Sequence, residues 1–294
     1  MSETVIEVTG LVKEYGGHRA VAGVDLSVPE GEIFSLLGPN GAGKSTTVEI
    51  LEGFRRRDGG AVRVLGVDPE KADRSWRSRI GIVWQGETLL PKVPVREVVR
   101  HFAGHHPRPR DPDAVLELVG LTEKARALPE SLSGGQRRRL DVALGIVGDP
   151  ELLFLDEPTT GFDPKARRDF WELIRNLARE GTTVVLTTHY LEEAEALADR
   201  VCVLAEGRVR ALGSPATLGG RATAQATVHW SQDGVRREIR TDEPTRVITE
   251  LAAGYPGEIP ELRVHRPTLE DVYLELIGDA EGIGTRTAQP EAVA

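Results

Sequence analysis

The sequence contains little cysteine, few aromatic residues and no long apolar run. Cys202 is the one cysteine among 294 residues, and Phe, Trp and Tyr make up 5% of the chain. A lone cysteine cannot close a disulfide within the chain. Its neighbours Val201 and Val203 are apolar, so the pattern predicts a small buried side chain in a reducing compartment.

The chain also lacks an excess of positive charge. It has 37 Lys and Arg against 46 Asp and Glu, which gives a formal net charge of -9. Proteins that bind a phosphate backbone usually present a basic surface, so nucleic acid is not expected as a partner. No apolar run approaches the roughly 18 residues that cross a bilayer, and the first ten residues lack the features of a secretion signal. We therefore expect a cytoplasmic protein that does not enter the membrane by itself.

A glycine-rich stretch matches the phosphate-binding pattern G-x-x-x-x-G-K-[ST]. It consists of Gly38, Pro39, Asn40, Gly41, Ala42, Gly43, Lys44 and Ser45, and Thr46 follows it. An apolar strand is expected before it at 33–37 and a helix after it at 46–51. Backbone N–H groups of such a loop converge on one anion, beside the positive end of the helix dipole. Lys44 would contact the β- and γ-phosphates and Ser45 would contact Mg²⁺, so the stretch predicts a nucleoside triphosphate site.

Two carboxylates follow a second apolar strand, at 152–155. Asp156 at the strand end is expected to hold Mg²⁺, usually through water. Glu157 would orient and deprotonate the water that attacks the γ-phosphate, because a general base must lie within hydrogen-bond reach of that water. A solvated acidic turn is the alternative, and the apolar strand before the pair disfavours it.

A third motif opens the helix expected at 134–147. It reads Leu132, Ser133, Gly134, Gly135 and Gln136. Ser133 is expected to cap the helix. Glycine in the first helical turn costs stability unless something must approach the backbone, so an anion is expected to bind there. The arginines that follow, at 137–139, are expected to form a solvated face.

Strands and helices alternate from residue 33 onward, which predicts a mainly parallel sheet covered on both faces. Core strands are expected at 33–37, 80–84, 152–155, 183–186 and 200–204. Residues 4–28 and 61–67 read as an antiparallel β subdomain. We expect a P-loop α/β domain at 1–220 with a helical insertion at about 90–148. A small α+β domain at 221–278 and a disordered tail at 279–294 would follow.

The order of these motifs resembles the ATP-binding cassette (ABC) ATPase family over residues 4–212. The resemblance implies that Tyr15 stacks on adenine and that Gln85 meets Mg²⁺ and the attacking water. It also implies that His189 contacts the γ-phosphate and that Asp163 belongs to the segment called the D-loop. Phe162 departs from the leucine that is more usual in that segment.

The resemblance further implies how the chain works. Ser133 and Gly135 would close on ATP held by a second copy or by a homologous cassette, so that nucleotide joins two cassettes. Separate transmembrane permease subunits would complete the transporter, and this chain would lie peripherally on the inner face of the cell membrane. Their docking surface is expected near Gln85, at Trp84, Glu87, Leu89, Leu90 and Val93.

The segment 266–275 resembles the ending of drug-resistance-type exporter ATPases, and it predicts a helix that Thr268 and Asp271 cap. The sequence thus favours an exporter subunit. The alternatives are a non-transport ABC ATPase acting in translation or DNA repair, or an importer-type cassette. Each alternative has a feature that this sequence lacks. Repair types insert long coiled coils, ribosome-acting types carry two cassettes in one chain, and importer types usually carry a longer C-terminal region.

Overall fold

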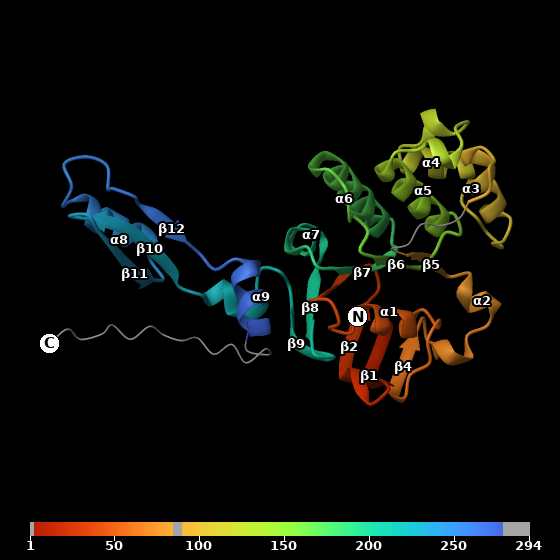
Figure 1. Ribbon diagram of the computed structural model, residues 1–294, viewed down its shortest axis with the longest axis horizontal. Coiled ribbons are helices and arrows are strands. Elements are labelled where there is room, and N and C mark those ends of the chain that lie inside the picture. The colour runs from red at the N-terminus through yellow and green to blue at the C-terminus, as the bar shows by residue number, and fades with distance from the viewer. Residues whose placement is uncertain (1–2, 85–89, 279–294) are drawn as a thin grey trace. The chain divides into compact units, whose positions relative to one another are not determined.

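The computed structural model describes residues 3–84 and 90–278. This part of the chain divides between Leu212 and Gly213 into two compact units, which are described separately. Figure 1 shows the first unit as a sheet with helices around it and the second as a small sheet with its own helices.

A mainly parallel sheet forms the centre of the first unit, as predicted. Its order is β5-β6-β7-β3-β8-β9. The bounds are β3 Ile33–Leu37, β5 Ile80–Val83, β6 Leu152–Asp156, β7 Thr183–Thr188, β8 Arg200–Ala205 and β9 Arg208–Gly213. Neighbouring strands from β5 to β8 pair in parallel. The carboxyl ends of β3, β6 and β7 therefore meet at one edge of the sheet.

An antiparallel sheet in the order β2-β1-β4 packs against the helix that follows β3. Strands β1 (Thr4–Tyr15) and β2 (His18–Pro29) form a hairpin across Gly16 and Gly17, and β4 spans Gly59–Val64. Helix α1 (Lys44–Leu51) places Val48 and Leu51 in the core shared with these strands. The predicted antiparallel subdomain is confirmed.

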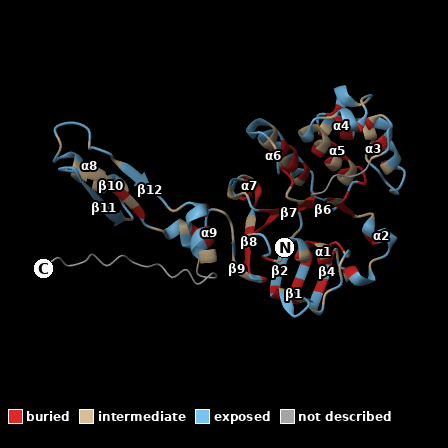
Figure 2. Cartoon of the chain, in the orientation of Figure 1, coloured by how far each residue is buried: buried red, intermediate tan, exposed pale blue. Residues whose placement is uncertain are grey.

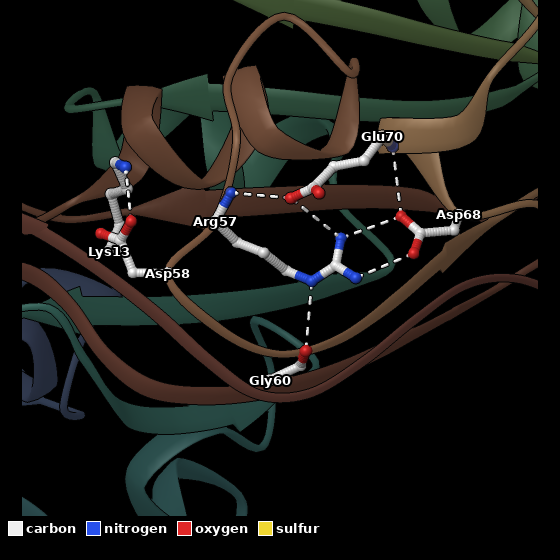
Figure 3. A network of polar contacts seen from close by, with 6 residues as sticks. All are labelled: Lys13, Arg57, Asp58, Gly60, Asp68 and Glu70. Atoms are coloured by element: carbon white, nitrogen blue, oxygen red, sulfur yellow. Dashed lines mark hydrogen bonds and ion pairs between the residues drawn. The ribbon is translucent and has the colours of Figure 1, made fainter.

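Polar contacts hold the loop after α1 against this sheet (Figure 3). The Arg57 guanidinium donates to both carboxylate oxygens of Asp68 at 2.8 Å and to the Gly60 carbonyl at 3.1 Å. Beside it, Asp58 accepts from Lys13 Nζ at 3.0 Å and from the Glu14 N–H at 2.7 Å. These bonds fix the end of β1 at the two residues before Tyr15.

The helices of the first unit fall into two groups. The predicted helical insertion contains α3 (Val95–Ala103), α4 (Pro112–Leu118) and α5 (Gly134–Ile146), with the short turns η2 (Thr122–Lys124) and η3 (Pro129–Ser131) between them. The remainder comprises η1 (Pro69–Lys71), α2 (Arg74–Arg77), α6 (Pro164–Arg179) and α7 (Leu191–Leu197). Figure 2 shows buried residues concentrated on the central strands and the inner side of α5. Cys202 on β8 is fully buried, as predicted, and burial raises the pKa of its thiol to about 12.

The second unit is a small α+β arrangement. Its sheet has the order β11-β10-β12, with β10 Ala226–Gln232, β11 Val235–Thr241 and β12 Arg263–His265. Its helices are η4 (Leu218–Thr223), α8 (Pro244–Ala252) and α9 (Leu269–Gly278). Thr268 and Asp271 exchange backbone-to-side-chain hydrogen bonds at the start of α9, which confirms the predicted capping box. Across both units, the described helices include none long and apolar enough to span a membrane.

Candidate nucleotide-binding site

A cleft of about 670 Å³ opens where β3, β6 and β7 end. Its lining comprises Tyr15, His18, Ala20, Asn40, Gly41, Gly43, Lys44, Ser45, Thr46, Glu157 and His189. The topology thus gathers residues from four distant parts of the sequence. His18 and Ala20 were not predicted, because they come from the β1–β2 hairpin and belong to no recognisable motif.

The glycine-rich loop wraps the start of α1 tightly. Gly43, the residue before the helix, has φ +98°, and a Cβ atom built on it would lie 2.4 Å from the Ala20 carbonyl oxygen. A side chain at this position would therefore both strain the backbone and collide with the hairpin. Within the described residues, no side chain caps this helix end. Its first N–H groups therefore remain available to an anion in the cleft.

Lys44 lies at the bottom of this loop with its ammonium group bonded to the loop itself. Its Nζ donates to the carbonyls of Gly38 at 2.8 Å and Pro39 at 3.1 Å. Burial lowers the pKa of Lys44, and the carboxylates of Glu157 and Asp156 act in the opposite direction. The loop thus holds a buried cation beside two carboxylates, and a phosphate group would be attracted to that cation.

The two carboxylates after β6 point to different partners. Asp156 accepts a hydrogen bond from the Thr187 hydroxyl on β7. Glu157 has φ +44°, a left-handed conformation that is uncommon for this residue type and often marks functional sites. Its N–H is held by the Thr187 carbonyl at 3.1 Å, and its Oε1 lies 3.2 Å from His189 Nδ1. The structure brings together the predicted residues Glu157 and His189. Thr187 was not predicted as a site residue, because a threonine on a buried strand is not distinctive in the sequence.

Tyr15 stands at the rim of the cleft with 39% of its surface exposed. Two cations flank its ring, with Lys13 Nζ 5.4 Å and the Arg55 guanidinium carbon 5.3 Å from the ring centroid. The hydrogen bonds to Asp58 anchor the strand that carries it. An exposed aromatic face at this rim is suited to stack on a base.

The amino-terminal end of α5 is built differently. Ser133 Oγ accepts the Gln136 N–H at 3.3 Å, and the Gln136 side chain accepts the Ser133 N–H at 3.1 Å, which is a capping box. A Cβ atom at Gly134 would meet no atom of the described chain within 4 Å. The predicted cap at Ser133 is confirmed. The fold itself gives no steric reason for glycine at this position.

The α5 end borders a second hollow of about 580 Å³ and does not line the cleft around Lys44. Leu132, Gly134, Thr160, Gly161 and Phe162 line this second hollow together with Glu157. Asp163 caps α6 next to it by accepting the N–H groups of Lys165 and Ala166, both at 2.9 Å. Phe162 packs edge-on against Phe170, with ring centroids 5.7 Å apart. Apart from Glu157, which lines both hollows, the predicted site residues that line them therefore form two groups within one chain.

The prediction of a solvated arginine face on α5 is wrong for Arg138. This side chain is 8% exposed and donates to the carbonyls of Asp156, Pro158 and Trp84. Arg139 donates to the Val119 carbonyl at 3.1 Å and pairs with Asp169 at 3.3 Å. The burial of Arg138 and the contacts of Arg139 depend on strands and helices that are distant in sequence, which the pattern along α5 could not reveal.

Part of the predicted docking surface lies within the described residues. Trp84 is 54% exposed and packs edge-on against Phe54, whose ring centroid is 5.4 Å away and which is 64% exposed. Val93 is also exposed, whereas Leu90 packs partly against the core. Gln85, Glu87 and Leu89 lie outside the described residues.

Residues 21–160 match the family described as ABC transporter. The chain is 38% identical over 306 residues to the daunorubicin/doxorubicin resistance ATP-binding protein DrrA of Streptomyces peucetius, a match that covers 93% of this chain and 92% of that protein. The chain belongs to the ABC transporter family. It is also 43% identical over 306 residues to the Nod factor export ATP-binding protein I of Ralstonia nicotianae, covering 94% and 95% of the two chains.

Solved structures support the same assignment. The ATP-binding subunit of an ABC transporter matches 93% of this chain and 100% of its own length, with a TM-score of 0.69; at 22% identity it supports the fold alone. The cbiO1 protein of Clostridium perfringens, part of the ABC transporter complex cbiONQ, is 29% identical, covers 73% of this chain and 90% of its own, and has a TM-score of 0.67. This ABC protein is thus an ATP-binding and ATP-hydrolysing subunit of a transporter, in the group that contains DrrA and the Nod factor export protein.

Proposed function

We propose that this ABC subunit drives export by clamping ATP between two cassettes at the inner face of the cell membrane. Its partners would be separate membrane-spanning permease chains. The nucleotide-binding domain would comprise residues 1–220, and residues 221–278 would form an accessory domain. Export is favoured over import because the names of the relatives DrrA and Nod factor export ATP-binding protein I refer to drug resistance and to export.

The observation that carries the proposal is the separation of the two phosphate-directed helix ends. The start of α1 lines the cleft around Lys44, whereas Gly134 at the start of α5 lines a different hollow. Ser133 and Gly135 would therefore reach a nucleotide held by another cassette. A bacterial ABC transporter cassette that was solved as a dimer supports this arrangement; it is 28% identical, covers 71% of this chain and 98% of its own, and has a TM-score of 0.64.

Several groups would hold the nucleotide in the cleft. Tyr15 would stack on adenine, the N–H groups of the loop at 38–43 would surround the phosphates, and Lys44 would contact the β- and γ-phosphates. Ser45 and Asp156 offer hydroxyl and carboxylate oxygens, which fit Mg²⁺ because it prefers hard oxygen ligands. The ion, when bound, would neutralise charge on the phosphates. Gln85 and Thr46 complete the proposed set.

Glu157 would act as the general base in ATP hydrolysis. The Glu157 carboxylate would accept a proton from the attacking water. The contact between Glu157 Oε1 and His189 Nδ1, at 3.2 Å, would keep this carboxylate oriented. His189 would contact the γ-phosphate from the end of β7. Cleavage of the γ-phosphate would remove the group that Ser133, Gly135 and the start of α5 hold across the interface, so the two cassettes would separate. Asp163, beside that interface, would help to align it.

Replacing Glu157 with Gln tests the base. We expect kcat for ATP hydrolysis to fall by about 10²–10⁴-fold, because the amide cannot accept the proton. ATP binding should persist, and an ATP-bound dimer should accumulate in size-exclusion chromatography. Glu172→Gln, an exposed position on α6, is the control and should hydrolyse ATP normally. Turnover by Glu157→Gln at the wild-type rate would refute the assignment.

Mixed dimers test whether the site is shared. A Ser133→Ala chain paired with a Lys44→Ala chain has one composite site in which both groups are intact, so residual hydrolysis should reappear on mixing. Each variant alone should be inactive. If mixed dimers that form in gel filtration show no recovery, the shared-site arrangement fails.

Purification from detergent-solubilised membranes tests the transporter role. A stoichiometric polytopic membrane protein should accompany the tagged chain. Retention of ribosomes or DNA in its place would favour a non-transport ATPase.

A further inference from the structure

Arg138 is a buried charge that the nucleotide chemistry does not use. It sits on the second turn of α5, two residues after Gln136, with 8% of its surface exposed. Burial lowers the pKa of Arg138, and the carboxylates of Asp141, Asp156 and Glu193 act in the opposite direction. An arginine in such a place is costly unless its donors are satisfied.

Among the described residues, backbone carbonyls accept the hydrogen bonds of this guanidinium. Nε donates to the Pro158 carbonyl at 3.1 Å, and one terminal nitrogen donates to the Asp156 carbonyl at 2.8 Å. The other terminal nitrogen donates to the Trp84 carbonyl. The planar guanidinium therefore spans both sides of Glu157 on one segment and the residue before Gln85 on another.

These acceptors are the backbone that carries the proposed catalytic groups. Asp156 and Pro158 flank Glu157, whose left-handed conformation needs support from its surroundings. Thr159, one residue further on, is held from the other side, because its hydroxyl donates to buried Glu193 Oε1 at 2.8 Å. The turn that presents Glu157 is thus fixed from α5 by Arg138 and from α7 by Glu193.

We infer that Arg138 is a positioning residue that fixes the Glu157 turn and the Trp84 backbone to the helix whose amino-terminal end meets the partner's nucleotide. The inference rests on the proposed function for that last contact and for the role of Glu157 as the base. Through this residue, the Glu157 backbone keeps a defined position relative to Ser133. In the proposed dimer, Ser133 and Glu157 of one chain serve different ATP molecules, so Arg138 links the two nucleotide sites through one chain.

Substitutions at Arg138 should separate turnover from nucleotide binding. In Arg138→Gln, kcat for ATP hydrolysis should fall by about 10- to 100-fold, because small misplacements of a catalytic group have effects of this order. The affinity for ADP should change less than about threefold, since Lys44 and its loop do not contact Arg138. Arg138→Lys should recover part of kcat, because an ammonium group keeps the charge but not the planar fork.

Arg139 supplies the matched control on the same helix. It donates to the Val119 carbonyl and pairs with Asp169, so its polar partners differ from the β6 carbonyls that Arg138 binds. Arg139→Gln should lower the melting temperature but leave kcat within about twofold of wild type. Arg139→Lys is the control for Arg138→Lys.

The experiment measures kcat, KM, ADP affinity and melting temperature for the full-length chain and these four variants. Wild-type kcat in both Arg138 variants would overturn the inference. Equal losses of kcat in the Arg138 and Arg139 variants would also overturn it, since the role would then be structural alone. If Arg138→Gln does not fold, the comparison of the two lysine variants decides, and equal kcat values would overturn it. Absence of hydrolysis by the wild-type chain would instead point to a failure of the proposed function.

Discussion

The amino-terminal ends of α1 and α5 both lie at glycine-containing motifs, yet they satisfy their backbone in different ways. At α1, no described side chain caps the helix, and Gly43 adopts φ +98° against the Ala20 carbonyl. At α5, Ser133 and Gln136 form a complete capping box, and Gly134 has open space around it. We propose that a ligand in its own cleft completes the first end. The second end has a side-chain cap of its own and is exposed.

This difference indicates that the glycines at the two helix ends are needed for different reasons. Gly43 is required by the fold, whereas the described chain gives no steric reason for glycine at 134, and we propose that a nucleotide held by another cassette requires it. Substitutions at the start of α1 should therefore change stability and activity together. At the start of α5, the effect of a substitution on activity should not follow its effect on stability. The following predictions test that distinction.

Lys44→Ala should have the largest effect. Loss of its charge-assisted hydrogen bonds, each worth about 1.5–3 kcal/mol, should weaken ATP affinity by about 10- to 100-fold. Equilibrium binding of ATP to the purified chain measures this effect. Exposed Lys71 on η1 is the control, and Lys71→Ala should bind normally. Unchanged affinity in Lys44→Ala would contradict its phosphate role.

Gly43→Ala should impair both folding and binding. The added methyl group would lie 2.4 Å from the Ala20 carbonyl oxygen in a left-handed conformation. We expect the free energy of unfolding to fall by about 1–3 kcal/mol, as for other strained backbone positions. Denaturant titration and ATP binding should show the two losses together. Loss of ATP binding at unchanged stability would mean that the loop tolerates the methyl group sterically.

Ser133→Ala should have a moderate effect on stability and a large effect on turnover. Removing the cap that accepts the Gln136 N–H should lower the free energy of unfolding by about 1 kcal/mol. Asp111→Ala, which removes the cap of α4, is the matched control. Both variants should have a lower melting temperature. Ser133→Ala should lose ATP hydrolysis, whereas Asp111→Ala should keep it. Equal activity in the two would contradict a ligand role for Ser133.

Gly134→Ala should have the smallest effect on stability, and of the opposite sign. Alanine favours helix over glycine by up to about 1 kcal/mol, and no described atom obstructs it, so the melting temperature should stay equal or rise. The ATP-trapped dimer should nevertheless be lost in the Glu157→Gln background. Formation of that dimer at wild-type level would show that nothing approaches this backbone closely.

The sequence indicated the central strands, the cleft loop and the helix of the third motif, because each has a strong local signature. Apolar runs at 33–37 and 152–155 match β3 and β6 closely, since strands buried on both faces must be apolar. What it could not indicate depends on contacts between distant segments. Arg138 looks like one of three surface arginines until β6 is placed beside α5, and His18 enters the cleft through the geometry of a hairpin.

The burial of Cys202 has a practical consequence. Its thiol has a pKa of about 12 and therefore remains protonated at neutral pH. Because the side chain on β8 is fully buried, it is also shielded from alkylating reagents. A spectroscopic label can therefore be attached to a cysteine introduced at an exposed position such as Glu130, beside the start of α5, without removing the native residue. Distances between such labels would follow the approach of two cassettes directly during nucleotide turnover.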